Sequence, residues 1–290
     1  MNKKFKYIYW YPIRLLPNKL RYFITYSLIK RRIPNLFRPR DYSEYICRDM
    51  LLNRNDKHAF LADKFKVRDY VKGKGLADIL THLFGVWDDA NKINFDLLPD
   101  KFALKCNHGC GMNIICDDRS QLDIKMAIST LNKWMFETHD IYYESHYKKI
   151  KPVIICEEFI SDNSGLFPMD YKIHCAHGKP VFIQVCIERS KNAGGVNCVY
   201  DLDWNDLHFA IDDKGHSVEL NISKPKNLDK MLNYASILSS DLNYARIDFY
   251  DVGDRVFFGE ITLTPMGGWL THFTKEAQIY MGTKIRNNEY

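Results

Sequence analysis

Two carboxylates and an arginine stand inside apolar runs near the C-terminal end of the sequence. Residues 246–265 read RIDFYDVGDRVFFGEITLTP, with Asp248 and Glu260 on either side of a Val-Gly-Asp turn. Aromatic and β-branched runs around such a turn predict a β-hairpin. Because side chains alternate faces along a strand, Arg246 and Asp248 share one face of the first strand, and Glu260 and Thr262 share one face of the second.

The length of the hairpin loop decides whether these two sets of side chains meet. A two-residue turn at Val252-Gly253 would place Asp248 and Glu260 on opposite faces of the sheet. A three-residue loop ending at Asp254 would pair 248 with 258 and 246 with 260. We expect this odd-length loop, with Gly253 available for its left-handed position, because it brings both carboxylates and the arginine together.

Two converging carboxylates would repel each other, and one of their pKa values would rise. A divalent cation relieves this repulsion, and hard oxygen ligands on a rigid sheet suit Mg²⁺, which also takes water and phosphate ligands. The alternative is a structural ion pair between Arg246 and Glu260 at the rim of the sheet.

A second candidate stretch reads FALKCNHGCGMNIIC and spans residues 102–116. Lys105 interrupts an apolar strand, and Gly109 and Gly111 flank Cys110 in the turn that follows. Backbone N–H groups of a glycine loop and a lysine on a strand both suit a phosphate group. The alternative is an ordinary glycine hairpin loop with a lysine that extends to solvent.

A third stretch, IICEEFISD at 154–162, is an apolar strand that runs into Glu157, Glu158, Phe159 and Ile160. Such a segment can serve as a hinge whose backbone pairs with the edge of an adenine. Further along the chain, Asp170 and Lys172 alternate on one face of a strand. These two side chains suit ribose hydroxyls and a phosphate.

The order of these motifs resembles the ATP-grasp superfamily, whose metal-binding strand and Pro-Gly element look like GEITLTPMGG. The sequence is more specifically similar to the TupA-like branch, named for teichuronopeptide biosynthesis. The likeness covers roughly residues 60–270, through the segments ADKFKVRDYV, LPDKFALKCNHGCG, DYKIHCAHGKP, YDLDWNDL and RIDFY with FGEIT. It implies an α+β fold in which two α+β subdomains clasp ATP.

The resemblance also implies a role for each candidate residue. Lys105 and Lys172 would bind ATP phosphates with Lys64 as a third, and Arg246 would act with Lys172 at the reacting centre by stabilising charge. The remaining assignments are Gly109, Cys110 and Gly111 to a lid, Glu157, Glu158, Phe159 and Ile160 to an adenine hinge, Asp170 to ribose, and Asp248, Glu260 and Thr262 to Mg²⁺. Thr262 stands where the superfamily usually has an Asn, and a hydroxyl can still ligate Mg²⁺ or hold a ligand water.

The reaction implied by the resemblance is carboxylate–amine ligation with ATP and Mg²⁺. ATP phosphorylates a carboxylate and an amine attacks the acyl phosphate; in this branch we expect a uronic acid of a cell-surface polysaccharide and an amino acid. The alternatives are a phosphotransferase acting on a sugar, and a degenerate nucleotide-binding scaffold in polysaccharide assembly. A glycosyltransferase would need a nucleotide-sugar domain, and none is evident.

The charge of the chain is unevenly distributed. Residues 1–40 hold eleven Lys or Arg and no Asp or Glu, so the remainder carries 30 basic and 36 acidic residues, a net charge of −6. A basic arm on an acidic body suggests an anionic partner for the arm and is not the pattern of a nucleic-acid-binding protein. Eight cysteines without a CxxC pair indicate reduced thiols in a cytoplasmic protein.

Within the arm, residues 18–32 place Leu20, Phe23, Ile24 and Leu28 at helical spacing. This amphipathic helix either lies on the inner face of a membrane or packs on the body. We expect a basic helical segment at 1–60 and a catalytic region at 61–290, with a lid subdomain at about 100–160 and a metal and substrate subdomain at about 161–290. Other expected elements are helices in 41–72, 121–139 and 226–241, a connector at 73–99, hairpins at 102–116 and 170–185, and a loop at 188–207.

Overall fold

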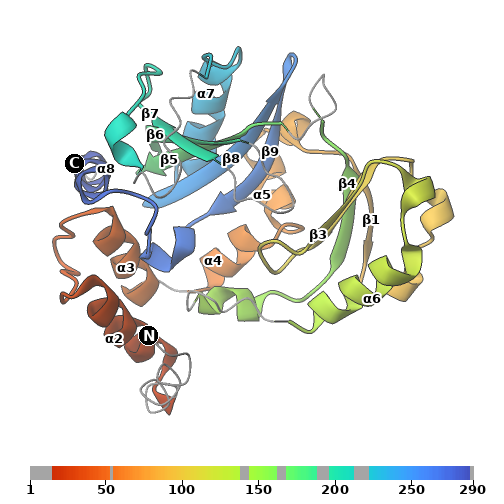
Figure 1. Ribbon diagram of the computed structural model, residues 1–290, viewed down its shortest axis with the longest axis horizontal. Coiled ribbons are helices and arrows are strands. Elements are labelled where there is room, and N and C mark those ends of the chain that lie inside the picture. Colours follow the sequence, from red (N-terminus) through yellow and green to blue (C-terminus); the bar gives the residue numbers. More distant parts are fainter. Residues whose placement is uncertain are drawn as a thin grey trace.

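Two antiparallel sheets with covering helices form the chain in the computed structural model (Figure 1). The structure describes residues 15–52, 55–137, 144–161, 168–187, 196–211 and 222–287. In sequence order, each sheet is built from strands that are close in the chain, and helices occur before, between and after them. The predicted α+β class is therefore confirmed.

Sheet A contains four strands in the order β1-β4-β2-β3. Their bounds are β1 Leu83–Trp87, β2 Phe102–Cys106, β3 Asn113–Cys116 and β4 Ile154–Glu158. The hairpin predicted at 102–116 is confirmed by the pairing of β2 with β3. The edge strand β1 lies in the predicted connector, so this sheet begins earlier than the predicted lid boundary at about 100.

Sheet B contains five strands in the order β7-β6-β5-β8-β9. Their bounds are β5 Asp170–Ala176, β6 Lys179–Ile187, β7 Val196–Tyr200, β8 Tyr244–Val252 and β9 Arg255–Thr262. The hairpin predicted at 170–185 is confirmed, and it turns at His177 and Gly178 with φ of 50° and 77°. The loop predicted at 188–207 is wrong for residues 196–200, which form strand β7. Residues 188–195 lie outside the described residues.

The two faces of sheet B are covered differently. One face packs its apolar side chains against α7 (Leu228–Ser239) and α5 (Val67–Gly73). At one end of the other face, α3 (Tyr42–Leu52) and α8 (Lys275–Asn287) cover a second apolar cluster. The rest of that face carries the polar side chains of the candidate site.

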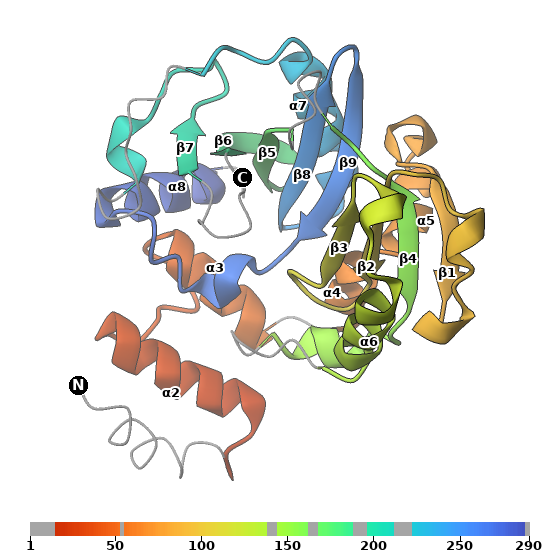
Figure 2. The same cartoon turned by 45° about the vertical axis from the view of Figure 1, so that its right-hand side comes forward.

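The remaining helices flank the sheets. In sheet A, α6 (Ile124–Met135) packs Ala127 and Leu131 into the core, and the Asp123 carboxylate caps its N-terminus by accepting from the Met126 amide. At the junction of the two sheets, α4 (Asn55–Ala62) lies against β9 (Figures 1 and 2). Helices thus occur in all three ranges predicted to contain them.

The N-terminal helix α2 (Asn18–Lys30) packs on α3, but not through the predicted apolar face. Its buried residues are Tyr22, Thr25 and Tyr26, whereas Leu20 and Leu28 are 45% and 58% exposed. Buried tyrosines are favoured where their hydroxyls find hydrogen-bond partners, and both do so here. Within the described ranges, no helix is both long enough and apolar enough to cross a lipid bilayer.

The β8–β9 hairpin corrects the predicted register. Val252 pairs with Arg255, so the turn has two residues, and Gly253 takes a left-handed φ of 61° as expected. The predicted pairs 248–258 and 246–260 are wrong: Asp248 pairs with Glu260 and Phe249 with Phe258.

The extra residue between these pairs is Gly259, which forms a β-bulge. A bulge resets the alternation of side chains, so Glu260 and Thr262 return to the face of Asp248 despite the even turn. A Cβ at Gly259 would lie 3.0 Å from the carbonyl oxygen of Asp248, so a side chain here would crowd the neighbouring strand. The carboxylates therefore converge through the bulge rather than through the loop.

Candidate functional site

The polar face of sheet B presents two cross-strand rows of side chains. Cross-strand partners lie side by side on one face of a sheet. The first row consists of Gln184, Lys172, Asp248 and Glu260, and the second of Phe182, His174, Arg246 and Thr262. Four predicted metal and catalytic residues, from β8 and β9, thus share one face with Lys172 from β5.

Arg246 joins the two predicted metal ligands. Its guanidinium donates to both carboxylate oxygens of Asp248 at 2.7 Å and to Oε1 of Glu260 at 2.9 Å. Burial alone would lower the pKa of Arg246, but Asp248 and Glu260 outweigh it and raise the pKa. The ion pair that was the structural alternative for Arg246 and Glu260 is therefore present, within a larger cluster.

Two lysines complete this cluster. Lys172 Nζ lies 2.5 Å from Oδ2 of Asp170 and 2.5 Å from Oδ2 of Asp248. Lys64 Nζ lies 3.4 Å from Oε2 of Glu260. Burial would raise the pKa of Glu260, but the positive charges of Lys64, Arg246 and Lys172 hold it well below its usual value. Glu260 is therefore ionised at neutral pH.

Asp170, predicted for ribose, lies inside the cluster. Its side chain is 2% exposed and its carboxylate faces Lys172. The structure thus brings Asp170 together with the phosphate and metal candidates and leaves little of it at the surface.

Lys105 lies apart from this cluster, on sheet A. Its Nζ is 2.8 Å from Oε2 of Glu157, and Oε1 of Glu157 accepts from Arg68 at 2.6 Å and from the Thr81 hydroxyl at 2.9 Å. Burial would raise the pKa of Glu157, but Lys105 and then Arg68 lower it below its usual value. Glu157 therefore acts as a buried anchor between Lys105 and the segment before β1.

The predicted adenine hinge is partly occupied by sheet pairing. Glu157 lies within the ladders that join β4 to β1 and β2, and the Glu158 amide donates to the His82 carbonyl at 2.9 Å. Phe159 and Ile160 follow the end of β4. Of the four predicted hinge residues, these two lie outside the strand ladders.

The predicted lid loop reaches from sheet A toward sheet B (Figures 1 and 2). Gly111 in this loop has a left-handed φ of 74°, which glycine adopts readily, whereas a Cβ at Gly109 would meet the Met112 sulfur at 2.7 Å. Cys110 at the tip is exposed to solvent, and among the charges of the site Glu260 raises the pKa of its thiol whereas Lys64 lowers it. The tip of the loop thus lies within the field of the sheet B cluster.

Sequence reasoning missed the residues that place Lys64. Asn107 donates from Nδ2 to Oδ1 of Asp63 at 2.8 Å and pairs in both directions with the backbone of Val153. The Lys64 amide donates to the Asn107 carbonyl at 3.1 Å. These contacts join segments far apart in the sequence, and the only local signal was an Asn directly after an apolar strand.

Tyr147 was also missed. It lies in a short 3-10 helix, Ser145–Lys149. Burial raises the pKa of its hydroxyl, and the carboxylates Glu144 and Glu260 add to the effect. The hydroxyl of Tyr147 is therefore protonated at neutral pH.

The donor set of the cluster fits Mg²⁺. Asp248 and Glu260 supply hard carboxylate oxygens as cross-strand neighbours, and the Thr262 hydroxyl lies 3.2 Å from Glu260 Oε1. Mg²⁺ takes one or two protein carboxylates together with water and phosphate oxygens, so a larger acidic cluster is not needed. Within the described residues, no group of three or more His, Cys, Asp or Glu side chains could hold a metal by itself.

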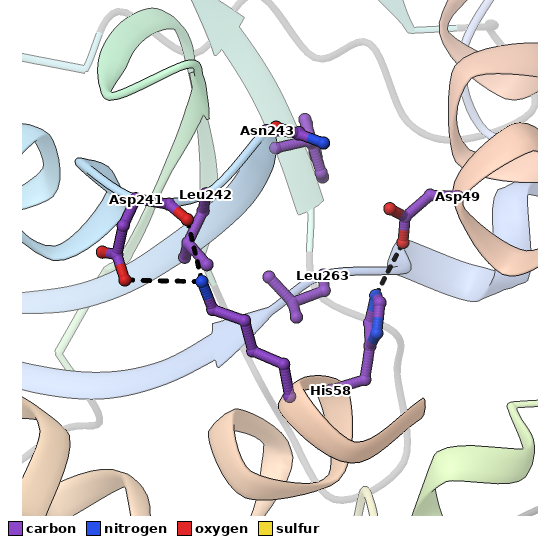
Figure 3. A pocket seen from close by; sticks show the side chains of 8 residues that line it. Asp49, His58, Asp241, Leu242, Asn243 and Leu263 are labelled. Atoms are coloured by element: carbon purple, nitrogen blue, oxygen red, sulfur yellow. Dashed lines mark hydrogen bonds and ion pairs between the residues drawn. The ribbon is translucent and has the colours of Figure 1, made fainter. Parts of the chain in front are cut away.

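A cavity of about 290 Å³ lies apart from these residues, at the N-terminal end of β8 (Figure 3). His58 points toward Asp49 with 2.6 Å between Nε2 and Oδ2, and Lys57 Nζ lies 2.8 Å from the Asp241 carbonyl oxygen. None of the predicted site residues lines this cavity. It is therefore not the site described above.

Replacement of Glu157 by Gln tests the anchor on sheet A. Gln keeps the shape but leaves the buried Arg68 without its counter-charge, so we expect a loss of about 3 kcal/mol in the free energy of unfolding at pH 7. The pKa of Glu157 is lowered in the folded state, so its stabilisation is complete above the ordinary carboxyl pKa of about 4.3 and is lost as the pH falls below it.

Urea unfolding at pH 7 and at lower pH measures the difference. The difference in the free energy of unfolding between wild type and Glu157→Gln should become smaller as the pH falls below the ordinary carboxyl pKa of about 4.3. A gap that stays constant across this range would show that the Glu157 charge does not carry the effect.

Comparisons with known proteins give weak similarities to solved structures and one match to a protein family. A search of curated protein sequences finds no match. Similar solved structures include D-alanine–D-alanine ligase from Bacillus anthracis complexed with ATP, with 16% identity over 79% of this chain and 68% of that chain, TM-score 0.42. D-cycloserine synthetase DcsG has 13% identity over 80% and 71% of the two chains, TM-score 0.45.

The ATP-grasp ligase PsnB, complexed with a minimal precursor, Mg and ADP, has 10% identity, covering 77% of this chain and 58% of that chain, TM-score 0.41. This chain thus spans less than two thirds of the length of PsnB. The sequence profile of the TupA-like ATP-grasp family matches residues 44–286. Since this match takes in most of the chain, the protein belongs to the TupA-like ATP-grasp family.

Proposed function

We propose that the protein is an ATP-dependent carboxylate–amine ligase that works through an acyl phosphate. The observation that carries the proposal is the charged cluster on sheet B, where Arg246 holds Asp248 and Glu260 together beside Lys172. In a chain of the ATP-grasp family, two carboxylates flanked by cations suit a nucleoside triphosphate with its metal. The lid loop that carries Cys110 lies opposite this cluster.

The residues on sheet B would divide the work between metal and phosphates. Asp248, Glu260 and Thr262 would hold Mg²⁺, which neutralises charge on the transferred phosphoryl group. Lys172 and Lys64, which now pair with Asp248 and Glu260, would turn to the phosphates. Their positive charge is held close to the site by these carboxylates before any ligand arrives.

Arg246 would act on the developing charge. Its side chain is 14% exposed and fixed by two hydrogen bonds to Asp248, so its orientation is set in advance. A preorganised donor in a partly dry site stabilises transition-state charge more than a mobile one in water. We assign Arg246 and Lys172 the catalytic roles and Lys105 a phosphate contact from sheet A.

The adenine and ribose assignments follow from the same arrangement. Phe159 and Ile160, beyond the end of β4, would offer backbone groups to adenine, and Asp170 would face the ribose next to Lys172. For the substrates, family membership supports a uronic acid of a cell-surface polysaccharide as the acid and an amino acid as the amine.

Lysine substitutions test nucleotide binding. Each charge-assisted contact to phosphate contributes roughly 1.5–3 kcal/mol, so Lys105→Ala and Lys172→Ala should each weaken MgATP binding by about tenfold to a hundredfold in titration calorimetry. Lys92→Ala is the control, because Lys92 forms an exposed ion pair with Asp88 outside the predicted site. Wild-type affinity in both site variants would contradict the phosphate assignment.

Product analysis tests the ligase. We expect release of ADP and phosphate only when a uronic acid and an amino acid are both present, because the amine completes the reaction of the acyl phosphate. A screen of amino acids against uronic acids, read by ADP release and by mass of the amide product, measures this. Phosphorylation of a sugar without an amine would indicate a phosphotransferase, and an absence of ATP turnover with all acceptors would indicate a scaffold.

We also propose that the N-terminal segment makes peripheral contact with an anionic membrane surface from the cytoplasmic side. The packing of α2 through its tyrosines leaves apolar side chains outside. The exposed fractions are 58% for Leu28, 47% for Ile29, 72% for Ile33 and 94% for Phe37. Arg31 and Arg38 are exposed beside them, and a bilayer of anionic lipid would attract each such charge by roughly 1 kcal/mol.

Vesicle co-sedimentation tests this contact. The double variant Leu28→Glu and Phe37→Glu should bind anionic vesicles at least about tenfold more weakly than wild type, because two apolar insertions are lost. Leu97→Glu is the control, since Leu97 is 81% exposed but lies near sheet A. If wild type fails to bind anionic vesicles at low salt, or if the control loses as much, the contact is disproved.

A further inference from the structure

The loop that follows β9 has an unusual backbone. Met266, Gly267, Gly268 and Leu270 all have left-handed φ values, of 49°, 55°, 79° and 44°. This conformation is costly for residues other than glycine and persists only where the surroundings enforce it. The question is therefore what enforces it here.

Three successive carbonyl groups of this loop accept hydrogen bonds from the N-terminal segment. The Tyr22 hydroxyl donates to the Gly267 carbonyl at 2.7 Å, the Ser43 hydroxyl donates to that of Gly268, and Lys30 Nζ donates to that of Trp269 at 2.6 Å. Tyr22 is 2% exposed and Ser43 is fully buried. We call these three donors the loop clamp.

The clamp packs closely against the backbone of the loop at Gly268. A Cβ at Gly268 would lie 3.1 Å from the Ser43 carbonyl oxygen and 3.2 Å from the Tyr22 hydroxyl. The Tyr22 ring also meets Trp269 edge-on, with 6.5 Å between ring centroids. Contact of this closeness makes the loop conformation depend on the position of α2 and α3.

The clamped loop follows the charged cluster directly in the chain. It begins at Pro265, three residues after Thr262 and five after Glu260, and the intervening Thr264 donates to Oε1 of Glu144 at 2.7 Å. Beyond its other end, burial and the nearby Arg246 guanidinium lower the pKa of His272 to about 4. A shift of this loop would therefore reach Glu260 and Thr262 directly along the chain.

The three clamp residues precede the range that the family profile matches. The family profile matches residues 44–286, whereas Tyr22, Lys30 and Ser43 all precede that range. Residues inside that range hold the loop as well, since Gln278 donates to the Leu270 carbonyl at 3.3 Å, and the clamp adds to these contacts.

We propose that Tyr22, Lys30 and Ser43 are positioning residues that hold the loop at 265–270 and thereby set Glu260 and Thr262 for the metal. The metal part of this inference rests on the proposed function. The competing view is that the same contacts only anchor α2 to the body. The two views differ in whether loosening the clamp changes metal-dependent nucleotide binding.

Two variants loosen the clamp, and each has a matched control. Tyr22→Phe and Lys30→Met remove one donor each, and Lys30→Arg keeps the charge and can restore the contact. Tyr70→Phe and Lys57→Met remove equivalent bonds to backbone carbonyls far from the loop, at Leu238 (2.9 Å) and Asp241 (2.8 Å). Each control also gives up a contact with the Asp241 carboxylate, so it removes at least as much bonding as its clamp variant without touching the clamp.

The first measurement is amide hydrogen exchange of the full-length protein without nucleotide. The amides of Gly267 and Trp269 donate to the carbonyls of Thr264 and Met266 at 2.9 and 3.0 Å, so they report opening of the loop. Loss of one clamp bond should speed exchange in the peptide spanning 265–272 by about twofold to tenfold. The control variants should leave this peptide unchanged.

The second measurement is the gain in affinity for the ATP analogue AMPPNP when Mg²⁺ is added. This gain should fall by about fivefold in Tyr22→Phe and Lys30→Met, consistent with one lost hydrogen bond, and should recover in Lys30→Arg. Faster exchange without a change in the Mg²⁺ gain would overturn the positioning role, and unchanged exchange would overturn the clamp itself. A wild type without any Mg²⁺ gain would instead refute the proposed metal site, while the exchange measurement would still decide the clamp.

Discussion

The bidentate grip of Arg246 on Asp248 is the interaction around which the site is arranged. Asp248 is 3% exposed, and a carboxylate at such a depth is stable only when it is paired and hydrogen-bonded. Arg246 and Lys172 provide that pairing, and Arg246 extends it to Glu260. Lys172 pairs with Asp170 as well as with Asp248, so the charges of the cluster form one connected network.

This arrangement requires five charged side chains from three strands to share one face of the sheet. Along a single strand, side chains spaced by two residues share a face. The sequence predicts Arg246 with Asp248, and Glu260 with Thr262, because each pair is spaced by two residues. It does not reveal how the two pairs meet, because a bulge at Gly259 and an odd-length loop would both place Glu260 on the same face of the sheet as Asp248. The pattern of apolar residues does not reveal a bulge; the one signal for it was the isolated Gly259 within the strand, which the sequence analysis did not use.

The same limit explains which other features could be predicted. The hairpins at 102–116 and 170–185 follow from local alternation and turn residues, and the structure confirms them. The partners of Glu157 and Asn107 lie tens of residues away, so no local pattern indicated them. The prediction of which face of α2 packs was wrong, because it relied on the spacing of the leucines and did not consider the tyrosines. Tyr22 and Tyr26 are buried instead, and their hydroxyls gain hydrogen-bond partners that leucine cannot have.

The balance of charges in the cluster stabilises the site as it is folded and, under the proposed function, also suits it to a triphosphate. Lys64, Lys172 and Arg246 face Asp170, Asp248 and Glu260, three positive against three negative groups, so no net charge is buried. Phosphates arriving with Mg²⁺ would exchange partners, with the lysines turning to phosphate oxygens and the carboxylates to the metal. Each lysine and each carboxylate would exchange one partner of opposite charge for another. The cost of removing these side chains from water is already part of the folded protein, so ligand binding does not have to supply it again.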